Sequence, residues 1–312
     1  MVLGISAYQW YQKQYPTRPQ TLINTQPIQH PNYHQLALNA LIKFKNLTPL
    51  KKTRLIDNLK SNILPLDLWL HNLKQTDNLL LCLGESHREI TRQFMAEQIF
   101  EQFKFDALYL ETNKRRFKKI QQRLKSSTQY FPMLEADILQ LLRSAEHNSP
   151  SIKTYAIDVD REEGENGKKL GAQQSIKTPR EDQIVSNLKR TYTAQGRSAI
   201  LFGALHCSAS PTWFYGKLLN SMQTNQPLKQ INTRIFSEHE DGPIEAFIYF
   251  IDQILPSTEH FVINDTKAFA KSIDQWFPLT QKVTFKPFES IIFYRHKLMQ
   301  LSQQKRLAKR ED

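Results

Sequence analysis

The chain contains only two cysteines, Cys82 and Cys207, and no C-x-x-C pair. This scarcity excludes a disulfide-stapled secreted scaffold and a zinc finger, because both need several closely spaced cysteines. We expect two separate thiols in a reducing compartment. Cys207 is interpreted as a buried structural thiol rather than as a nucleophile.

Long apolar runs are also missing. No stretch approaches the roughly 20 apolar residues of a transmembrane helix. The first residues, MVLGISAYQWYQKQYP, lack the basic start and apolar run of a secretory signal. We therefore expect a soluble, cytoplasmic protein, although a secretion route that uses no N-terminal signal leaves no trace of this kind.

Acidic residues are outnumbered, with 30 Asp and Glu against 42 Lys and Arg and a formal net charge of +12. Such a charge permits an anionic partner, for example a phosphate-bearing substrate, nucleic acid or an acidic membrane. The basic residues are dispersed and no nucleic-acid-binding signature accompanies them, so a solvated basic surface is the default interpretation. The densest basic run, Lys114–Lys125, is predicted to be a helix or loop. Its default interpretation is a solvated face, and the alternative is a surface that binds phosphate or lipid.

The patterns along the chain predict four regions. Residues 1–33 are rich in Gln, Tyr, Pro and Asn, which is typical of a loosely ordered arm. Residues 34–76 have helical periodicity with breaks at Asn46–Thr48 and Pro65, which indicates a helical cap. Residues 77–300 are expected to form one α/β domain, and residues 301–312 a charged tail.

Short apolar runs that alternate with helical patterns indicate the α/β domain. The clearest predicted strands are 79–83, 107–110, 152–157 and 198–202. A strand, a helix and a strand within about 30 residues form a βαβ unit, whose strands are parallel. We therefore predict a mostly parallel sheet flanked by helices. Further strand candidates follow His206, at 231–236, 246–250, 261–263 and 291–294.

Polar residues follow three of these strands. The first runs into Gly84-Glu85-Ser86-His87, the second ends at Glu111, and the fourth runs into Gly203-Ala204-Leu205-His206. In a parallel sheet the carboxyl ends of the strands share one edge, where ligands bind. Glu85, His87, Glu111 and His206 are therefore expected to converge on one polar site.

These residue types suit acid–base chemistry. A His beside a carboxylate can accept a proton while the carboxylate stabilises the imidazolium. Two His with two carboxylates equally suit a divalent metal that activates a bound water. Arg180, near a helix start, is either a surface group or a partner for a carboxylate or a developing oxyanion. Asp158 and Asp160, after the third strand, are further acids or turn formers.

The run LCLGESHREITRQFMAEQIFEQFKFDALYLE resembles the opening of the erythromycin-esterase-like, Tiki and ChaN superfamily. In that superfamily a G-x-x-H loop follows the first strand and a Glu ends the second. An Arg-containing helix and a second G-x-x-H come later. The corresponding residues here are Gly84–His87, Glu111, Arg180 within PREDQI, and Gly203–His206, which span roughly the middle 40–45% of the chain.

The resemblance implies different activities for different branches. The esterase branch uses His and Glu without an obligatory metal, the Tiki branch resembles metal-dependent peptidases, and the ChaN branch resembles haem-binding proteins of iron uptake. This chain departs from each. It has Ser86-His87-Arg88 where the esterase branch usually has Thr-His-Gly, and Ile184 where a Met is common. It also lacks the lipoprotein signal typical of the ChaN branch.

We predict a hydrolase of ester or amide bonds, with a small molecule or peptide as substrate and His87 as the general base on water. Glu111 assists His87, His206 and Arg180 stabilise the oxyanion, and Glu85 holds the loop. In a variant of this hypothesis His87, Glu111 and His206 bind a divalent Mn, Co or Zn ion. The alternatives are a haem- or metal-binding protein without turnover, and an inactive scaffold that holds a partner through its basic helical cap.

Overall fold

The computed structural model describes residues 31–125, 133–159, 180–193, 195–222, 228–238, 242–255, 259–273, 287–296 and 298–299. Most of the expected N-terminal arm, Asp160 and the expected charged tail lie outside these residues. Nothing about their structure enters the description of the fold.

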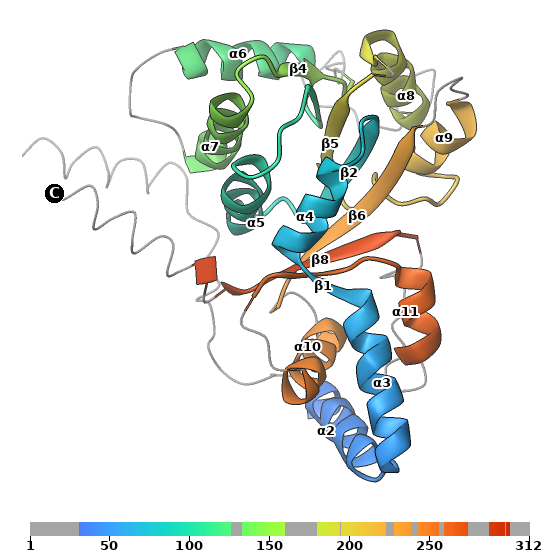
Figure 1. Ribbon diagram of the computed structural model, residues 1–312. Coiled ribbons are helices and arrows are strands. Elements are labelled where there is room, and N and C mark those ends of the chain that lie inside the picture. The colour runs from blue at the N-terminus through green and yellow to red at the C-terminus, as the bar shows by residue number, and fades with distance from the viewer. Residues whose placement is uncertain are drawn as a thin grey trace, which may run out of the picture.

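Helices and strands alternate through most of the chain (Figure 1). The helices are α2 (Pro31–Lys45), α3 (Pro49–Asn62), α4 (Leu66–Lys74), α5 (Glu89–Phe94), the π-helical turn η1 (Met95–Phe100), α6 (Lys114–Lys125), α7 (Met133–Asn148), α8 (Arg180–Thr191), α9 (Phe214–Ser221), α10 (Gly242–Ile254) and α11 (Thr266–Ile273). The strands are β1 (Ile63–Pro65), β2 (Leu79–Glu85), β3 (Ala107–Leu110), β4 (Lys153–Ala156), β5 (Arg197–Gly203), β6 (Lys229–Ser237), β7 (Phe261–Ile263) and β8 (Ser290–Tyr294). Within the described part of the chain, no helix is both long and apolar enough to cross a bilayer.

The strands form one sheet in the order β1-β7-β8-β6-β2-β5-β3-β4. All neighbours from β8 to β4 pair in parallel, whereas β7 is antiparallel to both β8 and β1. The mostly parallel α/β sheet predicted from the sequence is therefore confirmed. Because β2 and β5 lie side by side at its centre, the loops that follow them meet at one edge.

Helices cover both faces of the sheet. One core contains the inward side chains of α4, α5, η1, α6 and α7, and the other those of α2, α3 and α8 to α11. Strand β2 faces both: Leu79, Leu81 and Leu83 pack into the first core, and Leu80 and Cys82 into the second. A central strand buried on both sides needs an unbroken apolar run, which explains the sequence LLLCL.

The N-terminal helices pack against the sheet domain. Helix α2 contacts α10, and α3 contacts α11. Helix α3 begins with Pro49 in its first turn, as predicted, and Pro65 ends β1, an edge strand that the sequence did not predict. Only three residues long, β1 carries too short a pattern to be recognised, and a proline is tolerated there because an edge strand has a free side.

The strand predicted at 246–250 is wrong, because these residues lie within α10. Ala246, Phe247, Ile248 and Phe250 are buried around much of the helix, so their apolar run lacks a polar face. A short run of this kind is compatible with a buried strand or with a buried helix, and periodicity does not distinguish them. The other strand candidates after His206 are confirmed as β6, β7 and β8.

Cys82 and Cys207 form a disulfide, so the expectation of two separate thiols is wrong. The cysteines are 125 residues apart in sequence, and their pairing depends on the register between β2 and β5. The turn after β5 folds back over β2, where Gly84 leaves room for it. A Cβ atom at Gly84 would lie 3.0 Å from the Cα of Ala204 and 3.3 Å from the Cβ of Cys207.

Removing this cross-link is expected to destabilise the fold. Replacing both Cys82 and Cys207 by Ala should lower the free energy of unfolding by about 2–5 kcal/mol, because the bond closes a long loop in the unfolded chain. Urea unfolding of the oxidised protein beside the double variant measures the difference. Thiol titration of the unfolded, unreduced protein should find no free thiol, and two free thiols would contradict the pairing.

Candidate active site

The carboxyl ends of β2, β3 and β5 bring the predicted residues together. Glu85 ends β2 and His87 follows it, Glu111 follows β3, and His206 lies in the turn after β5. Arg180 begins α8 and reaches the same place, where it contacts both Glu111 and His206. All five residues predicted from the sequence are thus joined by direct side-chain contacts.

Glu85 is a buried anion held by a cation that the sequence analysis missed. Its side chain is 2% exposed, and both of its oxygens accept hydrogen bonds from Arg92 Nε at 2.9 Å. Arg92 Nη2 donates to Glu85 Oε1 at 2.8 Å. Burial alone would raise the pKa of Glu85, but hydrogen bonds from His87 and Arg92 outweigh it, and the net pKa is lowered. The carboxylate therefore stays charged beneath the loop of His87.

His87 has an unusual backbone. Its φ of 57° places it in the left-handed region, the only such case among non-glycine residues in the described ranges. This conformation costs free energy for a residue with a side chain and often marks a functional site. It turns the chain sharply between β2 and α5. The imidazole lies on the surface of the site, with its side chain 49% exposed.

Two carboxylates flank the imidazole of His87. Nδ1 lies 3.1 Å from Glu85 Oε1, and Nε2 lies 3.5 Å from Glu111 Oε2. Arg92 Nη2 is also 3.2 Å from Nδ1, but the shorter contact with an anion favours a proton on Nδ1 donated to Glu85. This hydrogen bond raises the pKa of His87 above its ordinary value, against the opposing effect of burial. Nε2 remains to exchange a proton with a reactant.

Glu111 is fixed by its neighbours on both oxygens. Oε1 accepts from Arg180 Nη2 at 2.9 Å, and Oε2 accepts from the backbone N–H of Gly203 at 2.6 Å. Gly203 permits this close packing, because a Cβ atom there would lie 2.6 Å from His87 Nε2. The glycine of the second G-x-x-H is therefore a steric requirement of the site.

Arg180 is the cation at the centre of the cluster. Its Nε and Nη2 donate to the two oxygens of Asp158, Nη2 also donates to Glu111, and Nη1 contacts His206 Nε2 at 2.9 Å. Burial alone would lower the pKa of Arg180, but the hydrogen bonds to Asp158 and Glu111 raise it, so it stays charged. A guanidinium has five N–H groups. These contacts use four, which leaves one on Nη1 to donate to a reactant.

His206 is held in one orientation. A guanidinium only donates, so Nε2 must accept from Arg180 and the ring proton lies on Nδ1. Nδ1 in turn lies 3.0 Å from Glu181 Oε2. Trp213 packs edge-on against the imidazole at 5.5 Å between ring centres, and Phe214 lies in the core against Phe202. Both nitrogens of His206 are engaged, whereas Nε2 of His87 is not.

Two functional neighbours escaped the sequence analysis. Arg92 lies on α5, and nothing in the local pattern distinguishes it from a surface cation. Glu181 follows Arg180 in the first turn of α8, where an acid is favoured in any helix, so its position did not mark it as a residue of the site. In the structure its carboxylate contacts His206. Asp158, considered from the sequence as a further acid or a turn former, pairs with Arg180 and also accepts from the backbone N–H of Val159.

The tentative metal ligands His87, Glu111 and His206 do not form a metal-binding group. No set of three or more His, Cys, Asp or Glu in the described ranges is arranged to hold an ion. The physical reason is Arg180, whose guanidinium lies between Glu111 and His206 and supplies the positive charge there. These residues therefore converge around the guanidinium group of Arg180.

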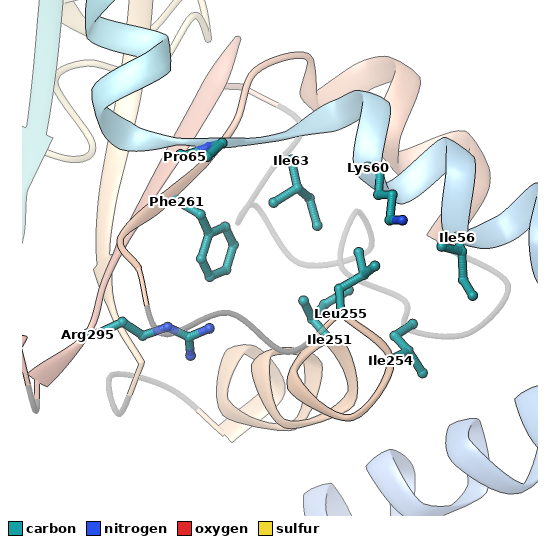
Figure 2. A pocket seen from close by; sticks show the side chains of 9 residues that line it. All are labelled: Ile56, Lys60, Ile63, Pro65, Ile251, Ile254, Leu255, Phe261 and Arg295. Atoms are coloured by element: carbon teal, nitrogen blue, oxygen red, sulfur yellow. The ribbon is translucent and has the colours of Figure 1, made fainter.

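The cavity at the cluster is small, and a larger one lies elsewhere. A space of about 40 Å³ borders Glu85, Arg92, Glu111 and Arg116. The larger cavity, about 470 Å³, is the apolar pocket in Figure 2, between α3, β1, β7 and α10. Figure 2 shows mostly aliphatic side chains around it, with Lys60 and Arg295 as the charged members. Glu85 and Glu111 of the cluster line the smaller cavity, whereas His87, Arg180 and His206 are not among the described residues that border it. We therefore place the candidate active site at the cluster of titratable side chains itself, not in either cavity.

No family model and no curated protein matches the sequence. Two solved structures described as bacterial protein toxins are distantly similar. One is 15% identical, with a TM-score of 0.37 over 65% of this chain and 43% of its own. The other is 12% identical, with a TM-score of 0.32 over 56% of this chain and 40% of its own. The chain spans less than half the length of either, and likeness at this level carries no argument about function.

Measuring the pKa of His87 tests whether its imidazole is hydrogen-bonded to Glu85. It should lie above 6.5 in the native protein, because Glu85 stabilises the imidazolium. The change Glu85→Gln removes the largest cause of the raised pKa and leaves burial and Arg92 opposed only by Glu111, so the pKa of His87 should fall. An NMR titration of the His87 Cε1 proton, assigned with His87→Gln, measures both values. The exposed Glu89→Gln is the matched control, and an equal shift in that variant would refute the assignment.

Proposed function

We propose that this protein hydrolyses ester or amide bonds by acid–base chemistry between His87, Glu111 and Arg180. The observation that carries the proposal is that His87 Nε2 and the Arg180 guanidinium lie against opposite oxygens of Glu111, His87 at the longer distance of 3.5 Å and Arg180 in a hydrogen bond of 2.9 Å. Proton transfer and oxyanion stabilisation are the two needs of acyl hydrolysis.

The steps follow from these groups. Neutral His87 takes a proton from water at Nε2 while the water oxygen bonds to the carbonyl carbon. The carbonyl oxygen becomes an oxyanion that accepts the remaining N–H of Arg180. Collapse of the adduct re-forms the carbonyl and breaks the bond to the leaving group, which takes the proton back from His87. The products are a carboxylic acid and an alcohol or amine.

The other residues position these groups. Glu85 holds Nδ1 of His87, and Glu111 lies 3.5 Å from Nε2, close enough to stabilise the imidazolium. His206 and Asp158 fix Arg180, and Glu181 fixes His206. We assign His206 a positioning role, because both of its nitrogens are engaged.

The proposal includes membership in the erythromycin-esterase-like, Tiki and ChaN superfamily, which the order of motifs resembles. Within it, the metal-free esterase branch fits best, because Arg180 occupies the centre of the cluster. A haem-binding role has less support. The cavity at the cluster, about 40 Å³, is far below the roughly 300 Å³ or more of a pocket for a drug-sized ligand. Among the described residues that line the larger cavity there is no His, Cys, Met or Tyr that would bind iron.

The compartment is a separate part of the proposal. A buried disulfide is typical of proteins in oxidising compartments, whereas the cytoplasm expected from the sequence keeps thiols reduced. The thiol state of Cys82 and Cys207 in protein trapped with iodoacetamide from living cells distinguishes these two locations.

Replacing the general base should abolish hydrolysis without unfolding the protein. We expect His87→Ala to lower the turnover of activated aryl esters by about 10²–10⁴-fold. The exposed His71→Ala on α4 is the matched control and should keep full activity. For wild type, the rate should rise as pH increases through the raised pKa of His87, because only the neutral ring accepts a proton.

A chelation experiment separates the proposal from its metal variant. Activity should survive dialysis against EDTA. If EDTA abolishes it and Mn, Co or Zn restores it, the metal-free mechanism is wrong. If wild type and His87→Ala hydrolyse every ester and amide tested equally, the hydrolase proposal itself fails.

A further inference from the structure

Helix α6 carries an unusual concentration of one charge. Its sequence, KRRFKKIQQRLK, contains seven Lys and Arg and no Asp or Glu. Six of these cations are exposed and form what we call the α6 basic face: Lys114, Arg115, Arg116, Lys118, Lys119 and Lys125. Figure 1 shows α6 on the outside of the molecule, beside α7.

The α6 basic face has no carboxylate partner among the residues that the structure describes. Within the part of the chain that the structure describes, none of its six side chains forms an ion pair with a carboxylate. A solvated helix usually mixes signs, as α8 does, where Glu181 and Asp182 precede Lys189 and Arg190. Like charges concentrated on one helix destabilise it, because side chains one turn apart repel each other. An external anion would relieve that repulsion.

The apolar side of α6 is already occupied. Phe117 and Ile120 are buried in the core on that face of the sheet. The helix therefore has no free apolar stripe to insert into a bilayer or a partner groove, and any docking on it must be electrostatic. Such docking is strongly weakened by salt.

We propose that the α6 basic face docks the protein on an anionic phospholipid membrane. Four to eight Lys or Arg on one side of an amphipathic helix is the pattern expected for a surface of acidic lipid headgroups. The face carries charges and the amides of Gln121 and Gln122, but no aromatic side chain. Single-stranded nucleic acid needs aromatic platforms for base stacking, so the observations favour lipid over nucleic acid.

The α6 basic face lies near the candidate active site, so docking through it would also position that site. Helix α6 begins at Lys114, shortly after Glu111, and Arg116 borders the small cavity with Glu85 and Arg92. Docking would thus hold the edge of the sheet that carries the candidate active site close to the membrane surface. The docking does not depend on hydrolysis, so the two proposals can fail separately.

Co-sedimentation with lipid vesicles tests the docking. The protein should bind vesicles with about 30% phosphatidylserine in phosphatidylcholine, and should not bind phosphatidylcholine alone. Binding should be lost in about 1 M salt, where the screening length is only about 3 Å. The variant Lys114→Gln, Arg115→Gln, Lys118→Gln, Lys119→Gln should bind a hundredfold or more weakly, since each cation contributes roughly a fivefold factor.

The matched control removes the same charge elsewhere. It carries Lys51→Gln, Arg54→Gln, Lys60→Gln and Lys74→Gln, all at exposed positions of α3 and α4. This variant should keep most of the wild-type affinity for acidic vesicles. Circular dichroism should show both variants folded, because Gln is a good helix former.

Three outcomes would overturn the proposal. The first is that wild type does not bind acidic vesicles at low salt. The second is that the control variant loses as much affinity as the α6 variant, which would mean that only net charge matters. The third is that wild type binds single-stranded RNA through α6 but not acidic vesicles, which would identify nucleic acid as the partner.

Discussion

The candidate site depends on one buried cation, Arg180. A guanidinium removed from water is costly unless its N–H groups find acceptors. Here Asp158, Glu111 and His206 supply them, and each of these comes from a different strand end. The same contacts that satisfy Arg180 therefore fix the carboxyl edges of β3, β4 and β5 relative to one another. Removing the cation would leave Asp158 and Glu111 as neighbouring unpaired acids.

A second ion pair supports the loop of His87 in the same way. Arg92 on α5 neutralises Glu85 at the end of β2, and Glu85 then orients the imidazole. The two arginines, Arg92 and Arg180, have different roles. Arg92 lies beneath the loop, with its charge satisfied by Glu85, while Arg180 keeps one N–H for a reactant. In the proposed reaction, this difference allows a site with two cations and several acids to present one base and one oxyanion donor.

The disulfide ties this edge to the centre of the sheet. Cys82 lies within β2 and Cys207 directly follows His206, so the bond anchors the turn that carries His206. Asn232 on β6 also donates to the backbone oxygen of Cys207 at 2.8 Å. The turn is therefore held covalently and by a hydrogen bond. His206, and through it the position of Arg180, therefore has a rigid support, which the proposed reaction would need.

The sequence by itself determined the parallel sheet and the meeting of Glu85, His87, Glu111 and His206. A buried strand needs an apolar run, and the carboxyl ends of parallel strands lie at one edge of the sheet. Local sequence patterns are therefore enough to predict these features. The sequence did not determine the helix at 246–250, whose apolar run suits a buried strand as well as a buried helix. It also did not determine the edge strand β1. Only the tertiary structure decided which charges pair. Arg92, Arg180 and Glu181 reach their partners from helices packed against the sheet, and the bond between Cys82 and Cys207 depends on the register of β2 and β5. No local pattern records that register, because it is set by packing between segments far apart in the chain.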